Sequence, residues 1–318
     1  MYGAVLTAFT VYISLDTFVI ERISDIPTDS ISFRPQNSSN LSQSELFSDS
    51  EVSSDNESSF ENSEPELPPE PMEPIITENS YIDDNIMINI TQRRVNETEC
   101  YIAEVRLSSA EYLKTAFAKG KFGKNIIQYT SQIAESVDAI FAINGDYYGI
   151  REKGYVIRNG VLYQDAGYKN NQEDLVIYPD GSFRIIKERE VPAQQLYDEG
   201  AWQVFTFGPA LVEEGKPSVT SADEVYTLNA SNPRTAIGIV DELHYIFIVS
   251  DGRTSESVGL SLLQLAELMV ELGVTTGYNL DGGGSATMVF NGRIVNKPTS
   301  HGDGIYERGI SDIVYIDR

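Results

Sequence analysis

Two hydrophobic patterns alternate along this chain, one typical of strands and one typical of helices. Alternating apolar and polar residues predict a strand at 101–107, and the continuous apolar run at 139–143 predicts a buried strand. We expect further strands at 202–207, 236–240, 243–250 and 310–316. Helical spacing of apolar residues predicts helices over 126–137 and 261–272. Turn residues predict hairpins at 159–160, 179–182, 241–242 and 291–292.

This succession of elements favours one fold class. Hairpins dominate, yet the helix expected at 261–272 joins two buried strands in a β-helix-β sense. We therefore expect the α+β class, with a mixed, twisted β-sheet, flanking helices and several hairpins in a single domain. We place that domain at residues 81–318.

Before residue 81 the pattern changes twice. Residues 4–20 are mostly apolar, but Asp16 interrupts them, so the run is shorter than the roughly 20 residues that span a bilayer. We interpret 1–24 as a membrane anchor or signal segment, with a buried helix as the alternative. Residues 25–80 are rich in Ser, Glu, Asp, Asn and Pro, which predicts a disordered acidic linker. This layout suggests a membrane-anchored protein with its folded domain outside the cell, or a secreted one.

Charge and cysteine content exclude several classes of function. The formal net charge is −25, and an acidic protein is a poor partner for nucleic acid because phosphates are neutralised by clustered Lys and Arg. Cys100 is the single cysteine, which excludes an internal disulfide and a structural zinc–thiolate site. A phosphate held locally remains compatible with this composition.

Polar residues follow several of the predicted buried strands. They are Asn144 and Asp146 after the strand at 139–143, Asp251 and Arg253 after 243–250, and Asn279 and Asp281 before a glycine run. If the strands are neighbours, their ends bring three carboxylates and an arginine to one rim. Each sequence taken singly is also typical of an ordinary turn.

The glycine run itself predicts a special backbone. Gly282, Gly283 and Gly284, followed by Ser285, suit positions with positive φ or close approach to a ligand. Exposed amides in such a run can form a nest that holds an anion. A flexible hairpin loop is the alternative interpretation.

These residue types suit the cleavage of a sugar derivative. Glycoside hydrolysis needs two carboxylates, for which Asp281 and Asp146 are the candidates. A phosphate leaving group would need less acid assistance and more positive charge, which Arg234, Arg253 and the glycine amides could supply. Two alternatives stay open: a phosphodiesterase with Mg²⁺ or Ca²⁺ bound by Asp146, Asp251 and Asp281, and a non-catalytic glycan-binding module using some of the 18 tyrosines.

Five motifs, in order, carry a resemblance to a known family. They are Asn144-Gly145-Asp146-Tyr147-Tyr148, Gly208-Pro209-Ala210-Leu211, Asn232-Pro233-Arg234-Thr235-Ala236, Asp251-Gly252-Arg253 and Leu280-Asp281-Gly282-Gly283-Gly284-Ser285. Over about 81–318 the chain resembles the phosphodiester glycosidase family, and Glu307-Arg308 resembles a further motif. Tyr147-Tyr148 departs from the family pattern, since many members carry Phe there.

The resemblance implies a single catalytic domain that hydrolyses the bond between the anomeric carbon of a sugar and a phosphate. It implies a glycan or sugar-phosphate substrate, and bacterial relatives suggest an extracellular polysaccharide. No cofactor is required, a divalent cation (Ca²⁺ or Mg²⁺) is compatible, and any metal ligands stay open. The residues that we expect to be catalytic are Asp281, Asp146 and Asp251. Those that we expect to bind the substrate or its phosphate are Asn144, Arg234, Arg253, Gly282, Gly283, Gly284, Ser285, Asn279 and Arg308.

Overall fold

The computed structural model describes residues 10, 19–24, 73–168, 171–221, 231–300 and 304–318. Most of the predicted anchor (1–24) and most of the predicted linker (25–80) lie outside these residues. The sheet already begins at Ile75, inside the range predicted as linker, because strand β2 (Ile75–Ile76) pairs with β3 (Ser80–Ile82). The folded part therefore starts before residue 81. None of the helices in the described residues is long and apolar enough to cross a membrane.

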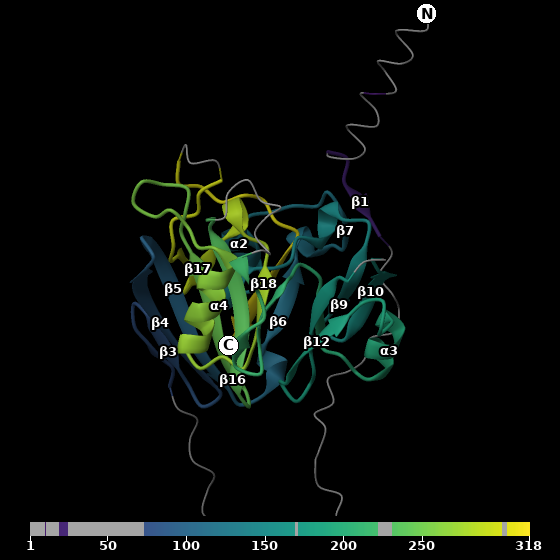
Figure 1. Ribbon diagram of the computed structural model, residues 1–318, viewed down its shortest axis with the longest axis horizontal. Coiled ribbons are helices and arrows are strands. Elements are labelled where there is room, and N and C mark those ends of the chain that lie inside the picture. Colours follow the sequence, from purple (N-terminus) through teal and green to yellow (C-terminus); the bar gives the residue numbers. More distant parts are fainter. Residues whose placement is uncertain (1–9, 11–18, 25–72, 169–170, 222–230, 301–303) are drawn as a thin grey trace, which may run out of the picture.

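A nine-stranded sheet forms the largest layer of the molecule (Figure 1). Its strands, in spatial order, are β15 (Lys216–Pro217), β14 (Ala210–Glu213), β18 (Thr276–Leu280), β16 (Arg234–Asp241), β17 (His244–Ser250), β5 (Thr98–Leu107), β4 (Ile86–Val95), β3 and β2. Helix α4 (Leu262–Glu271) connects β17 to β18. Those two strands run parallel but are separated by β16, which pairs antiparallel with both.

Two five-stranded sheets complete the body. The first contains β20 (Arg293–Ile294), β19 (Met288–Phe290), β8 (Ala139–Asn144), β21 (Asp312–Asp317) and β6 (Lys114–Phe117). The second contains β10 (Val161–Ala166), β9 (Gly154–Arg158), β13 (Gln203–Phe205), β11 (Glu173–Ile177) and β12 (Phe183–Lys187). A two-stranded pair joins β1 (Arg22–Ile23) to β7 (Gly123–Lys124).

The architecture is richer in strands than the predicted α+β arrangement. Among the described residues the α-helices are α2 (Thr130–Ser136), α3 (Ala193–Asp198) and α4, and every strand pair there is antiparallel. The expected β-helix-β connection is present, but β16 lies between its two strands, so the sheet contains no parallel neighbours in this part of the chain.

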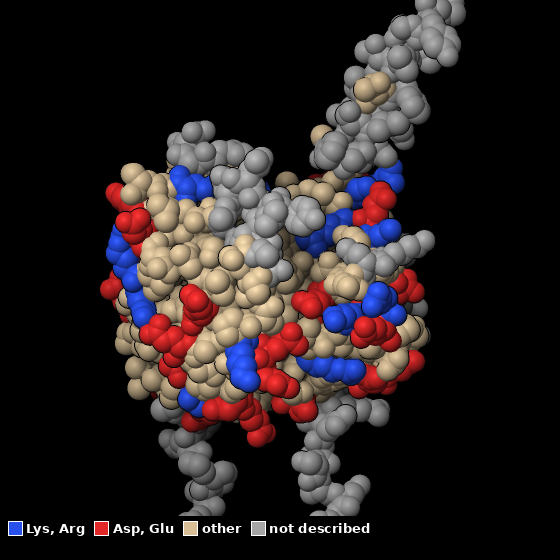
Figure 2. Space-filling view, viewed as in Figure 1, with Lys and Arg blue, Asp and Glu red and all other residues tan. Residues whose placement is uncertain are grey.

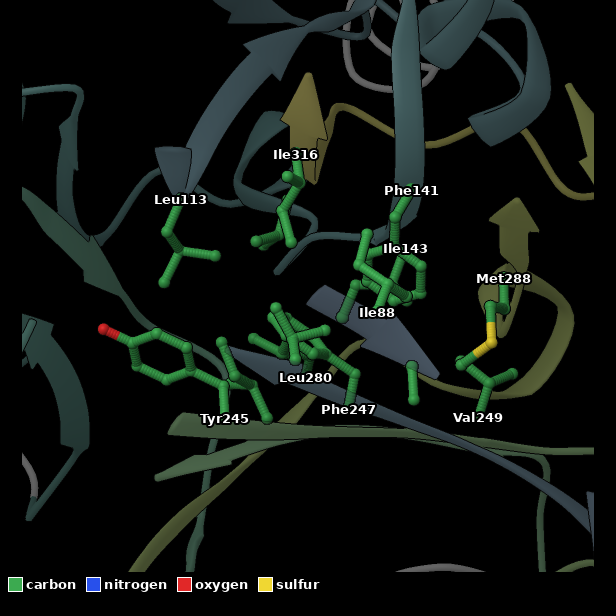
Figure 3. Packing of buried hydrophobic residues seen from close by; sticks show 14 of the residues in the cluster. Ile88, Leu113, Phe141, Ile143, Tyr245, Phe247, Val249, Leu280, Met288 and Ile316 are labelled. Carbon is green, nitrogen blue, oxygen red and sulfur yellow. The ribbon is translucent and has the colours of Figure 1, made fainter. Parts of the chain in front are cut away.

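The main core fills the space between the nine-stranded sheet and the sheet that contains β8. Phe141 and Ile143 of β8 point toward Phe247 of β17 and Leu280 of β18 (Figure 3). The rings of Phe141 and Phe247 meet edge to face, with centroids 5.1 Å apart. The opposite face of β8 packs against helix α2, so both faces of the strand are buried, which explains why its sequence is a continuous apolar run.

Each α-helix covers the outer face of one sheet. Helix α4 packs Leu265, Leu268 and Met269 on the nine-stranded sheet and begins with a capping box between Ser261 and Gln264. Helix α2 packs on the sheet of β8, and α3 packs on the sheet of β13. The contact with α4 requires two glycines that are paired across β16 and β18, Gly238 and Gly277. A Cβ atom at either position would lie within 2.8 Å of Met269 or Val274.

Most predicted elements are found, with one clear correction. The hairpin turns at 159–160, 179–182 and 291–292 join β9 to β10, β11 to β12 and β19 to β20, and the helix at 261–272 is α4. The helix predicted at 126–137 is wrong in its first turn, because α2 begins only at Thr130. Gln128 is extended there and exchanges two backbone hydrogen bonds with Ile310, which lies just before strand β21.

A fully buried group of three charges ties the two five-stranded sheets together. Arg158, at the end of β9, lies 2.8 Å from the carboxylate of Asp312 on β21 and 2.9 Å from that of Asp146. All three side chains are at most 1% exposed. Burial raises the pKa of Asp312 to about 6, although the charge of Arg158 acts in the opposite direction. One guanidinium therefore compensates two carboxyl groups in the interior.

Replacing this arginine should destabilise the fold strongly. Arg158→Met would leave Asp146 and Asp312 buried without their counter-charge, and should lower the free energy of unfolding by about 3–5 kcal/mol. Arg93→Met is the matched control, because the Arg93–Glu271 pair is exposed, and an exposed pair contributes less than about 1 kcal/mol. Urea denaturation of both variants measures the difference, and equal losses would contradict this role for Arg158.

Candidate active site

The end of β8 and the end of β18 meet at one buried side chain, that of Asn144. Its amide nitrogen donates a 2.6 Å hydrogen bond to the backbone carbonyl of Asp281, which follows β18. Its amide oxygen accepts from the hydroxyl of Thr235 on β16 and from the amide of Thr287. Asn144 thus connects two sheets and fixes the backbone at Asp281, which is a positioning role within the predicted site.

Asp281 is the carboxylate around which the site is built. Its side chain is 8% exposed and is held by Arg308, whose Nη2 lies 2.9 Å and 3.2 Å from the two carboxylate oxygens. The guanidinium of Arg308 also donates to the hydroxyl of Ser285 at 2.7 Å and 3.0 Å. The predicted residues Asp281, Ser285 and Arg308 therefore come together in space.

Electrostatic effects at Asp281 oppose one another. Burial raises the pKa of Asp281, while Arg308, the hydroxyl of Ser285 and the more distant charge of Arg151 act in the opposite direction. The pKa of Arg253 is lowered by burial and then by the charge of Arg308, and the nearby Asp281 counteracts this. Each of the three arginines thus interacts with the Asp281 carboxylate, and Arg253 and Arg308 also repel each other. An added anion would relieve this repulsion.

Arg151 was not predicted from the sequence. It follows the 3₁₀ helix η3 (Tyr148–Ile150), donates a hydrogen bond to the carbonyl of Thr206 and lies over the ring of Phe207, 4.7 Å from the centroid. Its position directly after the Asn144–Tyr148 motif was the available signal. Nothing in its own sequence context distinguishes it from a surface arginine.

Tyr147 forms one wall beside the arginines. Its backbone has a positive φ of 63°, which turns the chain sharply after β8. Arg308 lies over its ring, 5.4 Å from the centroid. Tyr148, its neighbour, is buried instead among Phe117 and Phe122. The two tyrosines that depart from the family pattern thus have different environments, and Tyr147 is the one beside Asp281 and Arg308.

The glycine run is required by close packing. A Cβ atom would lie 2.7 Å from the carbonyl of Pro233 at Gly282, 2.7 Å from the guanidinium of Arg253 at Gly283 and 2.5 Å from Ser300 at Gly284. Gly283 also has a positive φ of 60°. The amides of Gly283 and Ser285 donate to the carbonyls of Pro233 and Gly282. These two amides are already used within the chain, so the predicted open anion nest is not formed by them.

Three further predicted residues shape the backbone around the site. Nε of Arg234 donates to the carbonyl of Leu260, and its own amide donates to the hydroxyl of Ser250. The amide nitrogen of Asn279 donates to the carbonyl of Gly208. Arg253 donates to the carbonyl of Ser300 and to the side chain of Asn232. Arg253 thus lies against the glycine run, whereas the side chains of Arg234 and Asn279 donate to the backbone carbonyls of Leu260 and Gly208.

The other two predicted catalytic carboxylates have partners of their own. Asp146 is fully buried, and it accepts from the amides of Tyr148 and Thr206 in addition to its pair with Arg158. Asp251 is 4% exposed and accepts from the amide of Lys297 and from Asn296. Burial raises the pKa of Asp251, against these hydrogen bonds. No group of three or more His, Cys, Asp or Glu in the described residues is arranged to hold a metal ion.

Positive charge at the site is local. On the face shown in Figure 2, Asp and Glu side chains are spread widely over the lower half, with Lys and Arg interspersed. A chain with a net charge of −25 does not attract anions by its general field. The positive charges that interact with Asp281 are those of Arg151, Arg253 and Arg308.

Comparisons with known proteins agree with this picture. The family model described as phosphodiester glycosidase matches residues 138–317, which is more than half of the chain. The SPbeta prophage-derived protein YomE of Bacillus subtilis (strain 168) is 33% identical over 202 residues, which cover 61% of this chain and 30% of that protein. The N-acetylglucosamine-1-phosphodiester alpha-N-acetylglucosaminidase of Mus musculus is 42% identical over 160 residues, which cover 46% of this chain and 30% of the enzyme. The chain thus spans about three tenths of the length of these relatives.

A solved structure shares the fold. The catalytic domain of the zebrafish N-acetylglucosamine-1-phosphodiester alpha-N-acetylglucosaminidase, described as auto-inhibited by its pro-peptide, superposes with a TM-score of 0.60 and 21% identity. The match covers 73% of this chain and 83% of that domain. The range that the family model matches runs from β8 to β21 and contains Asp146, Asp281 and Arg308. On these grounds the chain belongs to the phosphodiester glycosidase family.

Proposed function

We propose that this protein hydrolyses sugar-1-phosphodiesters, cleaving the bond between the anomeric carbon and the phosphate oxygen. The products would be a free sugar and a phosphomonoester. The observation that carries this proposal is the arrangement of one buried carboxylate, Asp281, with three arginines that interact with it electrostatically. Membership of the family and the names of the curated relatives support the same class of substrate.

The arginines suit the phosphate of such a substrate. A phosphodiester is an anion, and planar guanidinium groups can donate to its oxygens in pairs. Arg253 and Arg308 repel each other in the free protein, so a phosphate placed between them gains from both. Positive charge held in place in this way would stabilise the charge that develops on the departing phosphomonoester.

Asp281 acts in its ionised form in this proposal. A phosphate leaves without a strong acid, so the reaction needs a base or nucleophile at the anomeric carbon more than it needs an acid. The ion pair with Arg308 keeps Asp281 ionised, while burial raises its pKa and makes its carboxylate more basic. The ring of Tyr147 provides a flat surface beside it for the sugar.

Asp146 and Asp251 support the site in this assignment and do not react with the substrate. Asp146 is compensated by Arg158 and holds the amides of Tyr148 and Thr206, which positions the segment carrying Tyr147 and Arg151. Asp251 fixes the backbone at Lys297, in the segment whose Ser300 contacts Arg253. We further propose that the substrate is a cell-surface or extracellular glycan, because the N-terminal sequence resembles an anchor or signal segment followed by a linker.

Removing the charge of Asp281 tests this assignment. Asp281→Asn keeps the shape of the side chain but removes its ability to act as base or nucleophile, so kcat should fall roughly a thousandfold or more. The matched control is Asp241→Asn. Asp241 is the last residue of β16, and its side chain is 65% exposed. Release of free sugar from a sugar-1-phosphodiester measures both variants. If Asp281→Asn keeps the turnover of the control, Asp281 is not the reacting group.

The pH dependence should follow the pKa of Asp281. Because its pKa is raised and its ionised form reacts, kcat/KM should increase as pH rises through that pKa, above the usual range of a carboxyl group. Arg308 favours the ionised form, so Arg308→Gln should move this acidic limb upward by about one pH unit.

The matched control for this pH profile is Arg106→Gln, which alters an exposed arginine paired with Glu104. Its acidic limb should coincide with that of the unchanged protein. An acidic limb that stays in place, or moves down, in Arg308→Gln would show that ionisation of Asp281 does not govern the rate.

A further inference from the structure

Two buried carboxyl groups outside the candidate active site lie on neighbouring strands: Asp174 belongs to β11, and Glu188 follows β12. Asp174 is fully buried and Glu188 is 3% exposed. Both carboxyl oxygens of Asp174 and Oε1 of Glu188 accept no hydrogen bond from a donor among the described residues. Oε2 of Glu188 accepts from the amide of Tyr168. Neither side chain belongs to the motifs of the sequence analysis.

Two buried carboxyl groups in contact do not both ionise. Asp174 pairs with Ile186 across β11 and β12, and the amide of Glu188 donates to the carbonyl of Gln172, so the two carboxyl side chains are diagonal neighbours on one face of the sheet. A hydrogen bond between them requires one of them to carry a proton. The pKa of Asp174 is raised well above its ordinary value, first by burial and then by the charge of Glu188. Burial also raises the pKa of Glu188, but the amide of Tyr168 and the hydrogen bond with Asp174 oppose this. The proton therefore belongs on Asp174 and the negative charge on Glu188.

The strand register connects this pair to Arg151. Leu175 pairs with Phe205 and Val176 with Val204 between β11 and β13, so Asp174 faces the next residue along, Thr206. The carbonyl of Thr206 accepts the hydrogen bond of Arg151. The charge of Arg151 lowers the pKa of Glu188 and also that of Asp281. The guanidinium of Arg151 thus interacts electrostatically with the carboxylates of both Glu188 and Asp281.

Other ionisable groups also face the pair. Asp146 raises the pKa of Asp174, but the charge of Asp146 is compensated by Arg158. Tyr155 and Tyr278 pack nearby, and the pKa of each is raised by burial and by these carboxyl groups, so both stay neutral. The ionised Glu188 is stabilised first by its hydrogen bonds with Tyr168, Asp174 and Tyr155, and then by the charge of Arg151.

We propose that Asp174 and Glu188 form a positioning pair, sharing one proton and carrying one negative charge, that holds Arg151 toward the phosphate of the substrate. The pair is a positioning device, because both residues are buried away from the surface where a substrate would bind. This inference rests on the proposed function for the role of Arg151. The shared proton itself can be tested without any substrate.

The proton is measured by infrared spectroscopy of the full chain. A protonated carboxyl group absorbs apart from carboxylates, and the spectrum is recorded above the pKa of about 6 of Asp312, so that this group is ionised. The difference between the unchanged protein and Asp174→Asn should show the loss of one buried protonated carboxyl. No difference would overturn the shared proton. A stoichiometric metal ion in the purified protein would overturn it as well, because a cation would then balance the two charges.

The effect on binding is measured with matched variants. Asp174→Asn removes the proton and leaves the ionised Glu188, so this variant keeps the negative charge. Glu188→Gln leaves Asp174, whose buried carboxyl stays protonated, so this variant and the double variant have no charge. In both of them the KM for a sugar-1-phosphodiester should rise on the order of tenfold, with a smaller change in kcat, whereas Asp174→Asn should change KM much less. A KM that rises equally in Asp174→Asn and Glu188→Gln would contradict a role for the charge.

A thermodynamic cycle shows whether the pair acts through Arg151. The double variant is also made in an Arg151→Gln background, which lacks the positive charge of Arg151, so the effect of the double variant on KM should largely disappear there. Additive effects would overturn the proposal and leave a purely structural pair. If the double variant fails to fold, the cycle is made with Glu188→Gln alone, and the same two results decide. If the unchanged protein releases no sugar while the infrared signal is present, the proposed function fails and the shared proton stands.

Discussion

Where two sheets meet at an angle, the backbone groups at the ends of their strands lose their regular partners, and each one that is buried needs another. Asn144 meets this requirement at the junction between β8 and β18. Its side chain satisfies the carbonyl of Asp281, the hydroxyl of Thr235 and the amide of Thr287. A buried group left without a partner would cost about 1–3 kcal/mol. The backbone that presents Asp281 is therefore held by groups that are themselves fully buried.

The charges of the site are arranged in two layers. Beneath it, Arg158 compensates Asp146 and Asp312 with hardly any contact with water. Beside Asp281, Arg308 and Arg253 are more accessible, and they repel each other. The lower layer is paired within the protein and fixes the chain, while the upper layer has a surplus of positive charge. This separation explains how a strongly acidic protein can present a place for one anion.

The sequence predicts which residues lie at the candidate site better than it predicts what each of them does there. The apolar run at 139–143 and the polar residues after it correctly indicate a buried strand that ends at the site. Arg308, which the sequence predicts to bind the substrate or its phosphate, lies beside Asp281. The roles of single residues were harder to predict. Asp146 and Asp281 both follow buried strands, and only the three-dimensional structure shows that Asp146 shares Arg158 with Asp312 in the interior. Arg158 and Arg151 belong to no motif, and their function depends on partners distant in the sequence. The same limit applies to the start of α2, where a long-range bridge at Gln128 overrides the helical pattern.

The central claim is that the reaction takes place at the anomeric carbon, next to Asp281, while the phosphate is only held. Hydrolysis of a sugar-1-phosphodiester in ¹⁸O-labelled water, followed by mass spectrometry of both products, tests this most directly. Our account predicts that the label enters the free sugar and is absent from the phosphomonoester. Label in the phosphate group would show attack at phosphorus and would contradict the account.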